Sequence, residues 1–367
     1  MKWNRRRKIL VVFLVIVVAV QGIGGLGDYY AQAVYPCVAT VLTLLSGYVP
    51  FAIGDLFIAL SIIGIVAFPF YAVRRKNKTV GYAIAGVGEY LLWVYVWFYL
   101  AWGLNYAQSD FYHRSHTSRY EANDDQLRHF AWRYADSLNA TYSKTAIYDT
   151  LRVQSLVVAG YKRLAQQNMG VHAPFHVHTQ AKTMLFTPLS SKVGVTGSMG
   201  PFFCEFTLNG DLRAHEYPST FAHEYAHLLG ITNEGEANFY AYQVCTSSAD
   251  RTMRFCGYYA IFFHVLRSVD AVLGDEAAED FLQYVRPEIR QMASADRNYW
   301  RLKYSTWLGN LQNAVYEFYL RTNRVDGGRK SYSQVVALIL SWEQRQGQMQ
   351  RHCIDYKTMC YRRIGNG

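Results

Sequence analysis

Two histidines and a glutamate in the segment HEYAH, residues 223–227, are the side chains of this sequence best placed to do chemistry. Positions i and i+4 share one face of a helix, so His223 and His227 can reach the same metal ion. Glu224 then lies near the open side of that ion, where it can act as a base. A helix with two unrelated histidines and a solvated glutamate is the simpler interpretation. The spacing therefore predicts a metal site only if a further ligand follows.

The segment NEGEAN, residues 233–238, offers that ligand. A zinc site that performs hydrolysis uses three protein ligands and leaves one position for water. Glu234 fits the E-x-x-[AS]-[DN] pattern that supplies the third ligand in many gluzincins, and Asn238 could hydrogen-bond a ligating histidine. Glu236 points to another helix face and is the alternative ligand. For both glutamates the competing interpretation is a favourable charge in the first turn of a helix.

These residues together predict metal-assisted hydrolysis with one zinc ion as cofactor. Zinc lowers the pKa of a bound water towards about 7, and Glu224 would move a proton from that water to the leaving amine. Tyr258, Tyr259 and His264 are candidate donors to a substrate oxyanion, with packing as their alternative role. Glu205, in PFFCEF, is expected on a strand near the cleft, because edge strands of zinc peptidases pair with substrate backbone. An ordinary strand carboxylate is the alternative there.

The elements that position this site follow a membrane region, residues 1–106. Segments at about 9–26, 53–73 and 80–106 are apolar and long enough to cross a hydrocarbon core, which takes about 20 residues. The stretch 29–51 is largely uncharged, but two prolines and a glycine interrupt it. We therefore expect three transmembrane helices and an interfacial or re-entrant segment at 29–51.

Basic residues set the expected orientation in the lipid bilayer. One cluster lies at residues 5–8 and a second at 74–78. Three crossings place both clusters on the same side, which the positive-inside tendency identifies as the cytoplasm. Everything after residue 106 is then expected outside the cytoplasm.

The outer part divides into a domain at 107–347 and a basic tail at 348–367. Amphipathic helices are expected from residue 123 or 124 to about 141 and at 149–167, and short alternating runs between residues 172 and 212 suggest a few strands. Helical periodicity dominates from residue 218 onward, at roughly 218–230, 233–247, 249–273, 276–292, 296–323 and 331–347. We expect a mainly α membrane protein with an α+β, zincin-like extracytoplasmic domain. Its small sheet would precede the HEYAH helix, and a long helical part would follow it.

Composition bears on partners and on the redox environment. The surplus of 37 Lys and Arg over 27 Asp and Glu gives a net charge of +10. No zinc-finger, RNP or helix-turn-helix signature accompanies that charge, so we expect no nucleic-acid partner. All six cysteines fall on the expected outer side, where disulfides persist. Cys245 with Cys256 and Cys353 with Cys360 are the nearest pairs in sequence, and unpaired buried thiols are the alternative.

Several stretches together resemble a bacterial domain-of-unknown-function family, number 3810. They are WGLNY at 102–106, GVTGSMGPFFCEF, HEYAHLLGITNEGEANFYAY, RFCGYYA and GRKSYSQVVALI. The resemblance covers nearly the whole chain and is most specific over residues 223–242. It implies a multi-pass protein of the bacterial inner membrane, similar to gluzincin-like HExxH zinc metallopeptidases. The shared motif contains His223, Glu224, His227, Glu234, Glu236 and Asn238.

The sequence thus predicts a membrane-anchored zinc metallopeptidase that hydrolyses peptide bonds of an envelope protein or peptide. One alternative is a non-catalytic membrane protein with a structural or sensory zinc site. An intact Glu224 disfavours it, because a structural site needs no base. The other alternative is zinc-dependent hydrolysis of a non-peptide amide, such as a cell-wall or lipid linkage.

Overall fold

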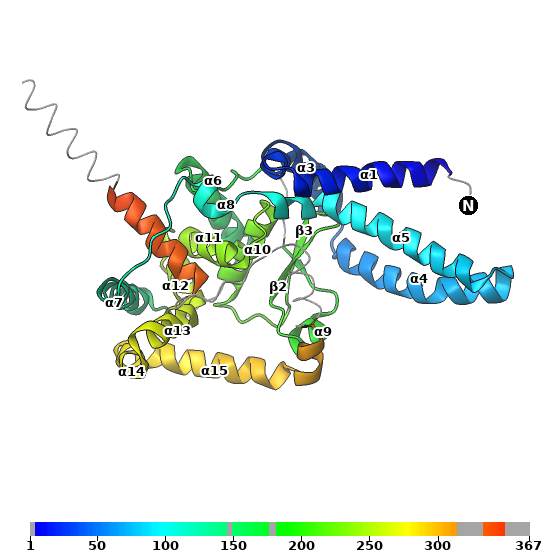
Figure 1. The fold of residues 1–367 in the computed structure, drawn as a ribbon. Helices are drawn as coiled ribbons and strands as arrows, with labels where there is room; N and C mark the ends of the chain where they lie inside the picture. Colours follow the sequence, from blue (N-terminus) through cyan, green and yellow to red (C-terminus); the bar gives the residue numbers. More distant parts are fainter. Residues whose placement is uncertain (1–3, 145–148, 176–180, 313, 315–332, 349–367) are drawn as a thin grey trace, which may run out of the picture.

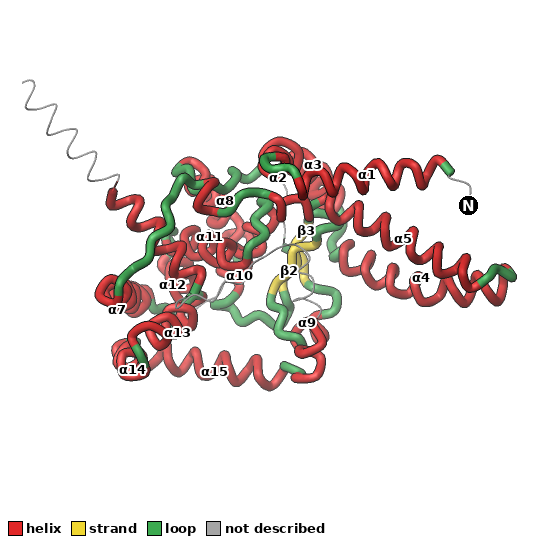
Figure 2. Tube along the Cα trace, viewed as in Figure 1, coloured by secondary structure: helices red, strands yellow, loops and turns green. Residues whose placement is uncertain are grey.

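The fold consists of a helical arm attached to a mainly helical domain (Figure 1). The computed structural model describes residues 4–144, 149–175, 181–312, 314 and 333–348. Helices dominate this described part, and its strands form one small sheet near the base of the arm (Figure 2). The arm is made of three helices: α1 (Arg5–Gly22), α4 (Ile53–Lys76) and α5 (Val80–Ala101).

Three helical segments of the described chain are long and apolar enough to cross a membrane: Leu26–Gly47, Ile53–Lys76 and Val80–Ala101. The last two are α4 and α5, and they correspond to the predicted spans at 53–73 and 80–106. The predicted end of the third span is wrong, because α5 ends at Ala101 and a 3-10 turn, Gly103–Ala107, follows it.

The segment Leu26–Gly47 covers most of the stretch 29–51, which is expected to be interfacial or re-entrant. It combines α2 (Leu26–Tyr29), a π-helical turn (Tyr30–Val34) and α3 (Tyr35–Gly47) into one helical run. By length and composition it could span, yet 39% of its apolar window is buried against the rest of the protein. Helix α1 covers the predicted span 9–26 as far as Gly22. Because this helix begins with four basic residues, it is not one of the three segments that are apolar enough to cross a membrane.

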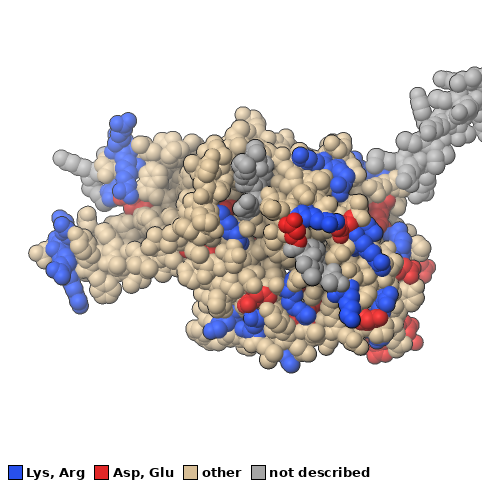
Figure 3. Space-filling view, turned by 180° about the vertical axis from the view of Figure 1, so that it is seen from behind, with Lys and Arg blue, Asp and Glu red and all other residues tan. Residues whose placement is uncertain are grey.

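Helix α1 runs along α5 within the arm (Figure 1). The rings of Phe13 and Trp93 meet edge to face with their centroids 6.4 Å apart. Nearer the tip, Arg7 Nε donates to Glu89 Oε2 at 3.0 Å, and Arg6 pairs with the same carboxylate. The start of α1 and the α4–α5 turn lie at the same end of the arm, so basic side chains gather at that tip (Figure 3).

The domain begins with α6 (Phe111–Arg114), followed by α7 (Asp124–Thr141) and α8 (Thr150–Gln166). Local sequence explains where the longer two start. Asn123 forms a capping box at α7, and Asp149 accepts from Leu151 N at α8. Both match the predicted helices closely.

The three-stranded sheet contains β1 (Lys182–Thr183), β2 (Gly197–Gly200) and β3 (Glu205–Leu208), with α9 (Thr187–Lys192) between the first two. The strand order is β1-β3-β2, with β1 parallel and β2 antiparallel to β3. Strand β3 is buried along its whole length. Phe206 on β3 packs on Phe221 of α10 (Tyr217–Leu228), with ring centroids 5.1 Å apart, so the sheet directly supports the HEYAH helix.

The boundaries of the C-terminal helices differ from those that the periodicity predicts. The predicted helix at 249–273 is two helices, α12 (Arg251–Ala260) and α13 (Phe262–Leu273), and α14 (Asp275–Tyr284) follows them. The predicted boundary between helices at 276–292 and 296–323 is wrong, because α15 runs without a break from Pro287 to Lys303. Proline at the first helical position favours this start. Further helical residues follow at 306–312 and 334–348.

Four cysteines lie within the described residues: Cys37, Cys204, Cys245 and Cys256. Cys245 and Cys256 are buried and are not joined to each other, so the disulfide considered for this pair is not formed. Cys353, Cys360 and the tail at 349–367 lie outside the described residues.

Candidate metal centre

The HEYAH helix α10 and the following helix α11 (Glu234–Thr246) are joined by a tight turn. Gly230 adopts a φ of 92°, a conformation that glycine tolerates at the end of a helix. Asn233 then caps α11, its side chain accepting from Glu236 N at 2.9 Å. Glu234 is consequently the first residue of α11, and its carboxylate returns toward the two histidines of α10.

Three ligand atoms converge between these helices. Glu234 Oε2 lies 3.1 Å from His223 Nε2 and 3.6 Å from His227 Nε2. The two imidazole Nε2 atoms are themselves 3.1 Å apart. Two imidazole nitrogens and one carboxylate oxygen form the ligand set of many hydrolytic zinc sites. The structure therefore brings together the three residues that the sequence proposes as ligands.

Hydrogen bonds on the far side of each imidazole fix its orientation. His223 Nδ1 donates to Asn238 Oδ1 at 2.9 Å, the contact expected for Asn238. His227 Nδ1 donates to Ile231 O at 2.7 Å. With each proton on Nδ1, both Nε2 atoms present a lone pair to the shared centre, as metal-ligating histidines do.

Residues at the base of the arm donate hydrogen bonds to the backbone of α10. Trp102 Nε1, directly after α5, donates to His227 O at 2.9 Å. Tyr35 OH, at the start of α3, donates to Leu228 O at 2.6 Å. The ligand helix is thus tied through its last backbone carbonyls to the segments that lead into the arm.

Glu224 lies beside this centre and is buried, with 5% of its surface exposed. Its Oε2 has no hydrogen-bond partner among the described residues. Burial raises the pKa of Glu224, although the neighbouring His223 and His227 act in the opposite direction. Gly197 of β2 makes room for it, since a Cβ there would lie 2.7 Å from Glu224 Cγ. A buried carboxylate with a free oxygen is available to take up a proton.

Electrostatic interaction between Glu234 and His227 favours the charged form of each. Burial alone would raise the pKa of Glu234, but hydrogen bonds from His223 and His227 outweigh it and lower that pKa. Burial would lower the pKa of His227, yet the contact with Glu234 raises it to about 9. A proton on His227 thus balances the charge of Glu234, and a divalent cation that binds here would displace this proton and use the Nε2 lone pair.

Glu236, the alternative ligand, lies outside this group. Its Oε1 accepts from Phe111 N at 2.8 Å, and its Oε2 accepts from Arg114 Nη2 at 2.6 Å. Glu236 is buried, with a side chain 6% exposed, and the Arg114 side chain is largely buried, at 11% exposed. Glu236 therefore anchors α6 to α11, and Glu234 alone faces the histidines.

The centre opens into a cleft of about 1250 Å³. Its walls come from β2, α10 and α11 on one side and from α13 and α15 on the other. Strand β2 is the sheet edge along this cleft. Thr196 O, just before β2, accepts from Asn209 N, just after β3, at 2.9 Å. Because hydrogen-bonded and non-hydrogen-bonded pairs alternate along antiparallel strands, the N–H and C=O groups of Gly197 and Met199 point away from β3.

Among the predicted substrate contacts, Tyr259 lines the cleft and donates its hydroxyl to Asp296, whereas the structure places the other three away from the lining. Glu205 lies on the central strand β3, not on an edge, where it pairs with Lys182 Nζ at 2.5 Å and accepts from Gly54 N. Tyr258 packs its ring against Tyr134 and Tyr242, away from the cleft lining. His264 Nδ1 lies 2.8 Å from Ser333 Oγ and is not a lining residue. The edge strand along the cleft is β2 and not the strand that carries Glu205.

Asp296 of α15 lines the cleft, and the sequence gives no local signal for it. Its carboxylate accepts from His215 Nε2 at 2.7 Å, and also from Arg213 and Tyr259. Asp296, His215 and Glu216 form a second group of possible ligand atoms. The side chains of Arg213, His215 and Tyr259 already donate to Asp296, so the cluster braces the cleft wall and is a poor metal site.

The architecture is thus a helical membrane-type arm joined to a domain that carries two histidines and a glutamate in metal-ligand arrangement. The sequence model of the family described as "Protein of unknown function (DUF3810)" matches residues 30–340, and the chain belongs to that family. Comparison with curated proteins and with solved structures finds no match.

Proposed function

We propose that this protein is a membrane-anchored zinc metallopeptidase that hydrolyses peptide bonds of an envelope protein or peptide. The convergence of His223 Nε2, His227 Nε2 and Glu234 Oε2 carries the proposal, together with the free buried oxygen of Glu224 next to them. These ligands would hold one zinc ion and leave a side open to the cleft. Zinc bound there supplies a water of lowered pKa and a Lewis acid.

Glu224 acts as the general base. Its raised pKa brings the carboxylate closer to the operating pH, which suits a group that must both accept and release a proton. In the proposed reaction Glu224 takes a proton from the attacking water and delivers it to the leaving amine. Asn238 keeps His223 in the tautomer that presents Nε2.

The free edge of β2 supports a peptide as substrate. An extended backbone can pair with the outward N–H and C=O groups of Gly197 and Met199 and lie along the cleft. This contact recognises main chain rather than side chains. It favours peptide hydrolysis over hydrolysis of a lipid or cell-wall amide, which would not use such an edge.

The arm provides the anchor in the proposed topology. Large apolar side chains on α4 are exposed, including Ile62, Ile63, Val66 and Phe70, and lipid is the environment that would cover them. The basic residues at the tip of the arm favour a cytoplasmic tip, which puts the domain on the outer side of the bacterial inner membrane.

A peptide profile of membranes tests this function. Membranes that contain the wild-type protein are compared with membranes that contain the Glu224→Gln variant at the same level. We expect peptides that are present only with the wild type, with their new termini in extracytoplasmic segments. Identical profiles at equal zinc content would instead favour the structural or sensory site.

A further inference from the structure

Exposed apolar side chains form a surface outside the arm, at the junction between arm and domain. We call this surface the apolar rim, and its residues are Leu185, Phe186, Leu189, Leu302, Trp307 and Leu311. Trp307 is 72% exposed and Leu302 is 84% exposed. Large apolar side chains that gather at one place on the surface, in contact with solvent, mark an interaction site.

The two halves of the apolar rim are held together by the backbone. Leu185, Phe186 and Leu189 lie on α9 and the residues just before it, whereas Leu302 is in the last turn of α15 and Trp307 and Leu311 follow that helix. Ser305 N donates to Lys192 O at 2.8 Å and joins these segments. The surface is therefore one unit although its halves are more than a hundred residues apart in sequence.

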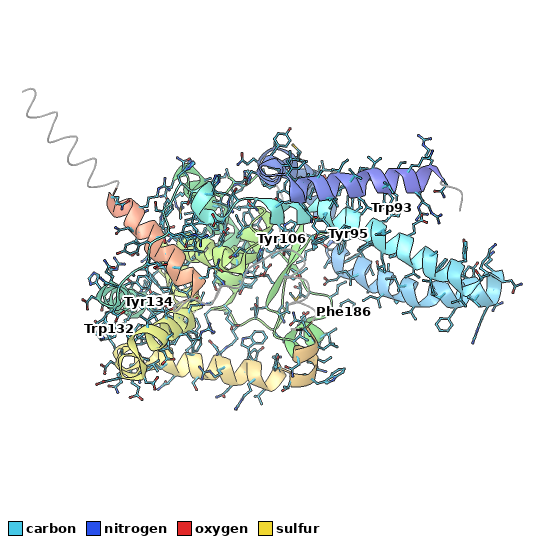
Figure 4. The ribbon with its side chains drawn as sticks, in the orientation of Figure 1. Trp93, Tyr95, Tyr106, Trp132, Tyr134 and Phe186 are labelled. Atoms are coloured by element: carbon cyan, nitrogen blue, oxygen red, sulfur yellow. The ribbon has the colours of Figure 1, made fainter. Side chains whose placement is uncertain are left out.

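The apolar rim lies at the level where the arm leaves the domain. Leu185 N donates to Asp55 Oδ2 at 2.9 Å, and Asp55 belongs to the first turn of α4. Gly54 N, in the same turn, donates to Glu205 Oε1. Phe186 lies on the side of the domain from which the arm projects (Figure 4). A bilayer crossed by the arm would consequently reach this surface.

Aromatic and basic side chains at this level suit a bilayer surface. Tyr48 is 82% exposed and Phe51 is 42% exposed, both in the short connection between α3 and α4. With Phe186 and Trp307 they resemble the aromatic belt that membrane proteins place at the headgroups. Lys192 and Arg301, both exposed, flank the apolar rim and can attract anionic lipids.

We propose that the apolar rim binds the outer surface of the bilayer that the arm crosses, so that the cleft opens at the membrane. The inference rests on the proposed crossing by the arm. Residues next to the apolar rim also line the cleft. They are Val193 and Gly194, just after α9, Trp300, two positions before Leu302, and Gln312, just after Leu311. A cleft held at this height takes substrates from the bilayer surface, which makes the juxtamembrane segment of a membrane-bound polypeptide the substrate class.

The depth of spin labels in the bilayer tests this proposal. Labels are attached to Phe186→Cys and to Trp307→Cys in the full chain, with Cys37, Cys353 and Cys360 changed to Ser. The protein is reconstituted in vesicles that contain anionic lipid. Label accessibility is measured with oxygen, which is enriched in lipid, and with a water-soluble nickel complex. Ile62→Cys on α4 serves as the lipid reference, and Gln283→Cys on α14, at the far end of the domain, serves as the aqueous reference.

We expect both rim labels to be more accessible to oxygen than to nickel, as at Ile62, with the opposite order at Gln283. Rim labels that behave like Gln283, while Ile62 reports lipid, would overturn the proposal. Labels accessible to neither reagent would also overturn it, because another part of the protein would then cover the rim. A label at Ile62 that reports water would refute the membrane crossing itself, whereas the test of peptide hydrolysis is independent of all three results.

Discussion

Asn238 Oδ1 accepts a hydrogen bond of 2.9 Å from His223 Nδ1, across the interface between α11 and α10. The bond couples the two helices of the candidate centre and determines which imidazole nitrogen faces Glu234. Since Asn238 stands four residues after Glu234, one face of α11 supplies both a proposed ligand and the support for another ligand.

Replacing Asn238 should weaken zinc binding without abolishing it. In Asn238→Ala, His223 loses the acceptor that fixes its tautomer, and the affinity for zinc should fall roughly 10- to 100-fold. Competition with a chromophoric chelator measures the affinity. Asn298→Ala, at an exposed position of α15, is the matched control and should bind zinc as the wild type does. Equal affinity in both variants would remove Asn238 from the site.

Substitution of Glu234 should affect zinc binding, whereas substitution of Glu236 should affect stability. Glu234→Gln should lose most of its bound zinc, because the variant lacks the carboxylate between the two histidines. Glu236→Gln should keep zinc but lose about 3 kcal/mol of stability, since Arg114 would remain buried without its partner. Zinc analysis and thermal unfolding in detergent measure the two effects. Loss of zinc in Glu236→Gln alone would reverse the assignment.

Gly197→Ala should damage catalysis while leaving zinc in place. The added Cβ would meet Glu224 Cγ at 2.7 Å and push the carboxylate out of its position. We expect a loss of peptide hydrolysis of about 100-fold, the scale of a misplaced general base. Gly210→Ala controls for the substitution itself, because its Cβ would come no nearer than 3.2 Å to its neighbours, which are side-chain atoms of Thr183 and Thr187. Undiminished hydrolysis in Gly197→Ala would count against the role of Glu224.

The helices that carry the candidate ligands could be predicted from sequence because their signals are local. Gly230 ends one helix and Asn233 caps the next, so the spacing of HEYAH and NEGEAN already determines which faces meet. The choice between Glu234 and Glu236 could not be made in this way. It depends on Arg114, which lies more than a hundred residues upstream and neutralises Glu236 only in the folded chain.

Long-range contacts also explain the elements that sequence patterns miss. Helical periodicity continues past residue 303, but α15 stops there, and Ser305 donates to the backbone of Lys192. Asp296 gains its role in the cleft only through His215, Arg213 and Tyr259, which come from distant parts of the chain. Such partners leave no trace in local spacing.

The Asp296 cluster predicts how stability depends on pH. Burial would raise the pKa of Asp296, but hydrogen bonds from His215 and Tyr259 and the charge of Arg213 lower it below its usual value. A carboxylate with a lowered pKa stabilises the fold above its unfolded pKa of about 3.9, and this contribution is lost as pH falls further.

Thermal unfolding between about pH 5 and pH 3 measures this contribution. The wild type should lose melting temperature more steeply than Asp296→Asn, which should already be less stable at neutral pH. Asp280→Asn, at an exposed position of α14, should follow the wild type. Parallel curves for the wild type and Asp296→Asn would contradict the role of the cluster.

The most direct test of the account is the hydrolysis of a broad peptide library by purified full-length protein and by Glu224→Gln, each assayed after its zinc content is determined. The substitution keeps the size of a buried side chain and touches none of the three proposed ligands. We predict one zinc per chain in both proteins, with hydrolysis at least about 100-fold slower in the variant. A zinc-loaded Glu224→Gln protein that hydrolyses peptides as fast as the wild type would contradict the account.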